Sequence, residues 1–166
     1  MMITMNKMMK TSVMFLATLL VACFTFYSCS EEDDKELPSS VEKAFYAKYP
    51  DATNVRWEKT KQYYEFEFYN GQYPSDAYFT YSGVWEYTET EIPYSVLPKA
   101  VSDAFQSSDW ANWNYDAGDI LQIDQAQGTL YLLDLYYGDE EIELLYSPDG
   151  KLKNAAEEIN YPYWTW

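Results

Sequence analysis

An internal repeat is the feature that most restricts how this chain can fold. Residues 37–45 (Leu-Pro-Ser-Ser-Val-Glu-Lys-Ala-Phe) align with residues 97–105, at a spacing of 60. Further along, residues 64–71 align with 131–138 at a spacing of 67, so the second copy carries about seven extra residues, mostly within 107–119. The two aligned segments occur in the same order in both copies, which favours a tandem duplication. In such repeats each copy needs its neighbour to bury a core.

Each copy is predicted to contain one helix followed by four strands. Pro38 and Pro98 suit the first turn of a helix, and Ser39 with Glu42 forms a capping-box pattern. The Asn-Gly pair at 70–71 is typical of a tight hairpin. Runs rich in Tyr, Phe, Trp, Val and Thr predict strands at 54–59, 62–69, 75–81 and 84–91 and, in the second copy, at 119–125, 129–137, 141–147 and 151–156.

The fold class that follows is α+β: a tandem repeat of a helix packed on a four-stranded antiparallel β-meander, in two copies. Alternation along the second strand places every other side chain under the helix. The same reasoning predicts a core of Val55, Trp57, Tyr64, Phe66, Phe68, Ala77, Phe79, Trp85, Leu121, Ile123, Tyr131, Leu133, Leu135, Ile142, Leu144 and Tyr146. A copy of about 60 residues is marginally stable alone, so we expect the two copies to fold together.

Composition excludes several classes of function. The 166 residues include no histidine and only two cysteines, both near the N-terminus. Serine or cysteine nucleophiles activated by histidine, and metal sites that need histidine or cysteine, are therefore ruled out. The net charge of −16 argues against nucleic acid and anionic membrane surfaces as partners. We predict a protein that is not an enzyme and that takes no cofactor or metal; the acidic runs at 116–119 and 139–141 are interpreted as exposed loops.

The N-terminus resembles a bacterial lipoprotein signal peptide, over residues 1–28. Lysines precede an apolar run of about 16 residues, which is shorter than the roughly 20 that a membrane-spanning helix needs. Cys29 opens an acidic tether at 29–36 and is the predicted lipidation site; Cys23, which ends the sequence Leu-Val-Ala-Cys, is the alternative. We therefore expect an outer-membrane lipoprotein of a Gram-negative cell envelope, periplasmic or surface-exposed, that contacts the membrane only through its lipid.

The body of the chain resembles a known family. The residues that carry the resemblance are Leu37-Pro38, Tyr49-Pro50, Trp57-Glu58, Tyr64-Glu65-Phe66-Glu67, Ala77-Tyr78-Phe79 and the run from Glu89 to Pro93. They are similar to the β-lactamase-inhibitor-like, PepSY-like proteins of bacterial envelopes. The resemblance covers about 37–160 and implies PepSY-like repeats at 37–95 and 96–160, followed by an aromatic tail at 161–166. It also implies protein binding, because such inhibitors cover an enzyme with a concave sheet.

The candidate binding surface is the sheet face that points away from the helices. It combines tyrosines, which are enriched at protein interfaces, with acids that would steer a basic partner. The alternative is a solvated sheet in which tyrosine is simply a good strand former. We predict a protein-binding or inhibitor-like module, with a glycan-binding accessory lipoprotein as the second hypothesis. The candidate residues are Tyr63, Glu65, Glu67, Tyr69, Tyr78, Asp134 and Tyr136, with Trp110 and Trp113 from the insertion.

Overall fold

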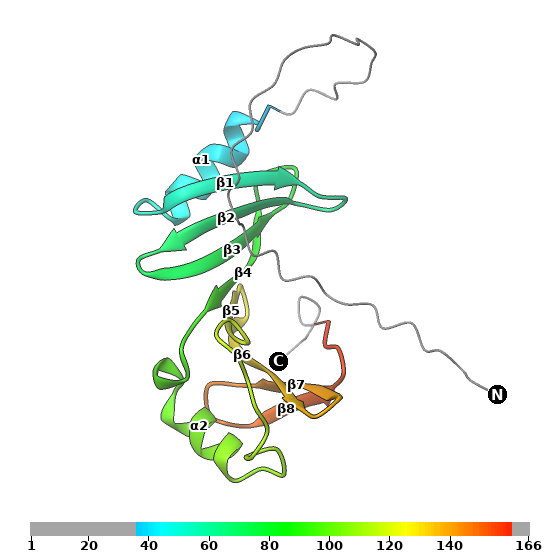
Figure 1. Ribbon diagram of the computed structural model, residues 1–166. Helices are drawn as coiled ribbons and strands as arrows, with labels where there is room; N and C mark the ends of the chain where they lie inside the picture. The colour runs from blue at the N-terminus through cyan, green and yellow to red at the C-terminus, as the bar shows by residue number, and fades with distance from the viewer. Residues whose placement is uncertain (1–35, 161–166) are drawn as a thin grey trace, which may run out of the picture. The chain divides into compact units, whose positions relative to one another are not determined.

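The computed structural model in Figure 1 describes residues 36–160, so the predictions for the signal peptide, Cys23, Cys29 and the tail at 161–166 lie outside the described residues. Within 36–160 the chain forms two α-helices, one 3₁₀ helix and eight strands. None of these helices is long and apolar enough to cross a membrane. The elements are α1 (Ser39–Lys48), β1 (Thr53–Lys59), β2 (Tyr64–Asn70), β3 (Tyr73–Phe79), β4 (Trp85–Glu91), η1 (Tyr94–Val96), α2 (Lys99–Gln106), β5 (Ile120–Gln125), β6 (Gly128–Tyr137), β7 (Glu140–Tyr146) and β8 (Leu152–Ala156).

All eight strands belong to one antiparallel sheet, in which each strand pairs with the next one along the chain. Tight turns make this order possible: Gly71 between β2 and β3 and Gly138 between β6 and β7 both have a positive φ, which glycine adopts without a Cβ clash. The pairing of β4 with β5 joins the two halves, with Thr88 opposite Asp124. The α+β class is therefore confirmed, as one continuous sheet with two helices.

Helix α1 covers one face of the first four strands. Val41 and Phe45 are 0% exposed, and the Phe45 ring stacks on Phe66 with 4.2 Å between ring centroids. Burying a phenylalanine of this size contributes on the order of 2–3 kcal/mol. The apolar cluster beneath α1 consists of Val41, Phe45, Tyr64, Phe66, Phe68, Ala77 and Phe79.

Helix α2 covers the same face of the second half. Val101 and Phe105 are its buried residues, and they share an apolar cluster with residues of β5, β6 and β7. The buried members of this cluster are Ile92, Leu97, Val101, Phe105, Ile120, Tyr131, Leu133, Leu135, Leu144 and Tyr146.

The predicted capping box does not form at the start of α1. The N-cap is Pro38, without a side-chain cap, and its carbonyl accepts the backbone N–H groups of Val41 and Glu42. Ser39 is already the first residue of the helix, so its hydroxyl is one position too far along to act as the N-cap acceptor. The proline-led start was predicted correctly, whereas the capping residue was not.

The turn before the last strand of each half lies against the backbone of a helix. A Cβ on Gly83 would lie 3.3 Å from the carbonyl oxygen of Ser40 in α1, and one on Gly150 would lie 2.3 Å from that of Ala100 in α2. The strand register also shifts at matching places, between Tyr78 and Phe79 and between Leu145 and Tyr146. The close approach to the helix favours glycine, which has no Cβ. The register shift is a β-bulge, and it occurs at the matching position in each half.

The sequence prediction for β5 was wrong about its faces. Leu121 and Ile123 lie on the face away from the helices, whereas Ile120 takes the place under α2. The pairing of β5 with β4 and β6 fixes this parity, and a shift of one residue moves every side chain to the other face. Leu121 and Ile123 instead join a separate apolar cluster with Leu130, Leu132, Leu145, Ala156 and Ile159.

Candidate functional site

The face of β2, β3 and β4 that points away from α1 carries tyrosines and carboxylates in alternating rows. Strand β2 reads Tyr-Glu-Phe-Glu-Phe-Tyr, so its aromatic core residues and its acids necessarily point to opposite sides. Cross-strand pairing then brings acids of three strands together. We call this surface the acid–tyrosine face; it consists of Tyr63, Glu65, Glu67, Tyr69, Asp76, Tyr78, Tyr87, Glu89 and Glu91.

Asp76 lies at the centre of the carboxylates. It is directly opposite Glu67 on β2 and directly opposite Glu89 on β4. Partial burial raises the pKa of Asp76 to about 7, and the carboxylates of Glu65, Glu89, Glu67 and Glu91 add to the shift. Like charges facing each other across strands destabilise a sheet, so this arrangement is unfavourable for the free protein.

Partial burial also raises the pKa values of two neighbouring acids, Glu65 and Glu91. Partial burial raises the pKa of Glu65, although the hydroxyl of Tyr78, 3.1 Å from its Oε1, donates a hydrogen bond that opposes the shift. Partial removal from water raises the pKa of Glu91, and Asp119 raises it further. Arg56 forms an ion pair with Glu67 at 2.8 Å at the β1 edge of this face.

The tyrosines form a packed group beside the acids. The rings of Tyr78 and Tyr87 stack with centroids 4.3 Å apart, and Tyr63 meets both of them edge-on at 6.1 and 6.2 Å. Burial and the surrounding carboxylates raise the pKa of Tyr78, so its hydroxyl stays protonated. Tyr69 stands apart and is 42% exposed. The result is a packed group of three rings, with the more exposed Tyr69 elsewhere on the same face.

The structure brings together only part of the predicted set. Asp134 and Tyr136 share the same face but lie on β6, in the second half, where Asp134 is opposite Glu143. The hydroxyl of Tyr136 donates to Asp116 Oδ1 at 3.3 Å. Trp110 and Trp113 pack on the opposite side, against the apolar cluster beneath α2, so they do not belong to the acid–tyrosine face.

Four members of the face escaped the sequence prediction: Asp76, Tyr87, Glu89 and Glu91. Asp76 could have been found, because it lies two residues before Tyr78 and alternation places both on one side. Tyr87 could not have been found by alternation. A bulge in β4 between Trp85 and Tyr87, opposite Phe79 and Tyr78, shifts the register by one residue. Trp85 therefore packs towards α1 while Tyr87 points the other way.

Two hollows border this face. One, of about 530 Å³, is lined by Arg56, Glu67, Tyr69, Asp76 and other residues of β1–β3, and the second, of about 450 Å³, by residues of the β4–η1 turn and the insertion. They share Pro74 and Glu91. Among residues 36–160 no group of three or more acids or cysteines is arranged to hold a metal ion. The chemistry that the face offers is attraction of cations and hydrogen bonding to carboxylates and hydroxyls.

Comparison with known proteins gives one family and several similar structures. The sequence model of a family described as "Putative beta-lactamase-inhibitor-like, PepSY-like" matches residues 30–73 and 62–154. Among curated protein sequences, none matches this chain. A BLIP-like protein from Bacteroides fragilis NCTC 9343 is 26% identical over 82% of this chain and 98% of its own, with a TM-score of 0.70.

Two further solved structures share the fold. A "putative periplasmic" protein from Bacteroides eggerthii DSM 20697 is 20% identical over 73% of this chain and 88% of its own, with a TM-score of 0.66. A DUF2874 family protein from Bacteroides ovatus ATCC 8483 is 24% identical over 72% of this chain and 86% of its own, also with a TM-score of 0.66.

Proposed function

Because this chain belongs to the beta-lactamase-inhibitor-like, PepSY-like family, we propose that it is a non-enzymatic module whose acid–tyrosine face binds a protein with a basic surface. The family resemblance and the BLIP-like neighbour support protein binding in general. The charge of the face supports a basic partner in particular. The partner would be held at β2–β4, on the side of the sheet away from α1.

The observation that carries this proposal is Asp76 among four other carboxylates. A sheet selected only for stability would not place acids directly opposite one another on three adjacent strands. Local rules of stability are commonly broken at functional sites, where a ligand restores the balance. A lysine or arginine side chain of a partner would place a positive charge beside Asp76, so binding would offset repulsion among the carboxylates around it.

The tyrosines would supply the contact area. Tyrosine is enriched at binding hot spots because it is large, stiff and amphipathic. The mutual packing of Tyr63, Tyr78 and Tyr87 holds their rings in place before a partner arrives, which lowers the entropy lost on binding. The glycan hypothesis stays a prediction, and a polysaccharide that shifts tyrosine fluorescence would favour it.

Site-specific photocrosslinking tests the proposal. A benzophenone amino acid replaces Tyr69, which is 42% exposed on the acid–tyrosine face, or Tyr46, which is 44% exposed on α1. The two positions match in residue type and exposure and differ in the side of the sheet. We expect irradiation of whole cells to give a discrete protein adduct from position 69 and none from position 46.

The charge dependence of that adduct is the second part of the test. Glu65→Gln should weaken the adduct, and raised salt should do the same, since both reduce the attraction of a basic surface. Glu42→Gln, an exposed acid on α1, is the matched control and should leave the adduct unchanged. Equal adducts from positions 69 and 46, or an adduct from position 69 that neither salt nor Glu65→Gln weakens, would refute the proposed surface.

We also propose that the two halves arose by tandem duplication. The contacts of Gly83 with α1 and of Gly150 with α2 support this, as do the matching register shifts in β3–β4 and β7–β8. The glycines are 67 residues apart and the register shifts are too, which is the spacing of the sequence alignment. Independent glycines would have no reason to approach the same turn of two different helices.

The proposed location is the periplasmic or surface side of the outer membrane, with Cys29 carrying the lipid. The region that matches the family begins at residue 30, directly after Cys29. A tether at 29–36 would then leave the folded body free to meet a partner in the envelope. Membrane fractionation of cysteine variants, described in the Discussion, tests which residue is the anchor.

A further inference from the structure

The insertion that distinguishes the second half forms one wall of a cleft. The cleft, of about 450 Å³, lies where β4 ends and β5 begins. Its other walls come from the start of β3 and from the β4–η1 turn. The lining residues are Tyr73, Pro74, Glu91, Ile92, Pro93, Tyr94, Tyr115, Asp116, Ala117, Gly118 and Ile120.

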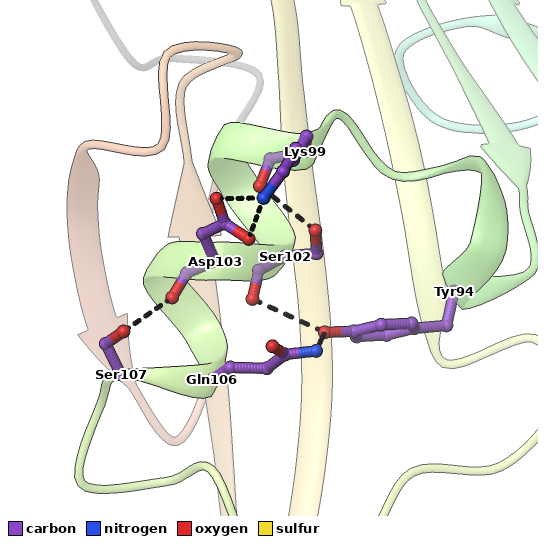
Figure 2. A network of polar contacts seen from close by, with 6 residues as sticks. All are labelled: Tyr94, Lys99, Ser102, Asp103, Gln106 and Ser107. Atoms are coloured by element: carbon purple, nitrogen blue, oxygen red, sulfur yellow. Dashed lines mark hydrogen bonds and ion pairs between the residues drawn. The ribbon is translucent and has the colours of Figure 1, made fainter.

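One side of the cleft is a pair of tyrosines held in fixed positions. The rings of Tyr94 and Tyr115 stack at 5.6 Å with 16° between their planes. Figure 2 shows how α2 positions Tyr94: its hydroxyl donates to the Ser102 carbonyl at 3.4 Å and accepts from Gln106 Nε2 at 3.1 Å. The apolar wall is therefore preorganised by the helix behind it.

The other side of the cleft is acidic. The Glu91 carboxylate lies next to the insertion, since a Cβ on Gly118 would lie 3.5 Å from its Oε2. The insertion is tied down nearby, because Asp116 Oδ1 accepts the Tyr136 hydroxyl and the Asp116 N–H donates to Asp119. Among residues 36–160, no lysine or arginine lines this cleft and Glu91 makes no ion pair.

We propose that this cleft receives an arginine side chain of the partner protein, an inference that rests on the proposed function. The alkyl stem would lie along Ile92, Pro93 and Tyr94, and the guanidinium would meet the carboxylate of Glu91. Arginine suits such a site because its planar cation stacks on aromatic rings and pairs with a carboxylate through two hydrogen bonds. The shared lining residues Pro74 and Glu91 connect the cleft to the acid–tyrosine face, so one basic partner could occupy both.

The test uses the full chain and two small probes. N-acetyl-arginine methylamide carries the cation, and N-acetyl-citrulline methylamide has nearly the same shape without the charge. In amide ¹H–¹⁵N NMR titrations we expect the arginine probe to shift Tyr94, Tyr115 and Gly118, with a Kd in the millimolar range, and the citrulline probe to bind at least about fivefold more weakly. Equal affinity for both probes, or shifts elsewhere only, would overturn the proposal.

Variants at the two sides of the cleft test whether the arginine probe binds there. Glu91→Gln should weaken arginine binding at least about fivefold, and Tyr115→Ala by a similar factor. Glu86→Gln removes the same charge at the other end of β4, outside the cleft, and should leave the Kd unchanged. An equal loss in Glu86→Gln would indicate a general charge effect and would refute the cleft as the binding site.

The two proposals can fail separately. An adduct from position 69 without arginine binding in the cleft would overturn this inference and leave the proposed function in place. Arginine binding without an adduct would support the cleft and remove the acid–tyrosine face as the partner surface.

Discussion

Replacing Asp76 by asparagine should stabilise the protein at neutral and alkaline pH. The pKa of Asp76 rises from 3.8 to about 7 on folding. A shift of this size corresponds to at most about 4 kcal/mol of unfavourable free energy for the ionised form. Asp76 is only partly buried and the Glu67 side chain opposite it is 49% exposed, so screening by solvent reduces the effect. We expect a gain of about 1–2 kcal/mol in the free energy of unfolding at pH 8.

The dependence on pH follows from the protons that each state binds. Between about pH 4 and pH 7 the folded protein holds a proton on Asp76 that the unfolded chain has released, so stability falls as the pH rises through this window. Below pH 4 both states are protonated and the variant gains little. The advantage of Asp76→Asn should therefore grow between about pH 4 and 7 and stay constant above it.

Urea unfolding at a series of pH values measures this difference directly. Subtracting the wild-type free energy from that of the variant removes the contribution of the other acids, provided that the m-value is unchanged. Asp51→Asn, at an exposed turn residue, is the control and should show no such pH dependence. If Asp76→Asn is destabilising at pH 8, or its effect does not vary between pH 4 and 8, the reasoning about the acid cluster is wrong.

Three further outcomes are expected. Residues 30–95 alone should show no cooperative thermal transition, because they lose the pairing of β4 with β5; a sharp transition would contradict this. Gly150→Ala should destabilise by at least about 2 kcal/mol more than Gly138→Ala in urea titrations, because only the former meets a helix backbone, at 2.3 Å. Cys29→Ala should release the protein from the membrane fraction; release only by Cys23→Ala would identify the other cysteine as the anchor.

Much of the fold was predictable because its signals are local. The alternation in β2 assigned Phe66 and Phe68 to the core, and both are buried there. The faces of β5 were not predictable in this way, since Ile120, Leu121 and Ile123 are all apolar and fit either parity. The pairing of β5 with β4 and β6 decides which of these side chains lie under α2, and this pairing cannot be inferred from the local sequence.

The candidate site was less predictable than the fold, because it depends on register across strands. Glu67, Asp76 and Glu89 are separated along the chain and come together only through the pairing of β2, β3 and β4. The cleft likewise depends on where the insertion returns to the sheet, through the bridge between Asn114 and Tyr136. Alternation along the strands indicated that acids and tyrosines share one face, but which acids lie opposite one another is known only from the pairing of the strands.

The same sheet face differs between the two halves, which supports the proposal that the partner binds to the first half. In the second half part of this face is apolar, and Ile159, which follows β8, packs there on Leu132 and its neighbours, next to the opposed acids Asp134 and Glu143. The Ile159 N–H donates to Glu143 Oε2 at 2.7 Å, which fixes that segment. In the first half Glu65 stands at the position of Leu132, whereas Glu67 and Tyr69 stand at the positions of Asp134 and Tyr136. Under the proposed function, the segment around Ile159 covers part of this face in the second half, and the acids of β2–β4 in the first half are the ones that meet the partner.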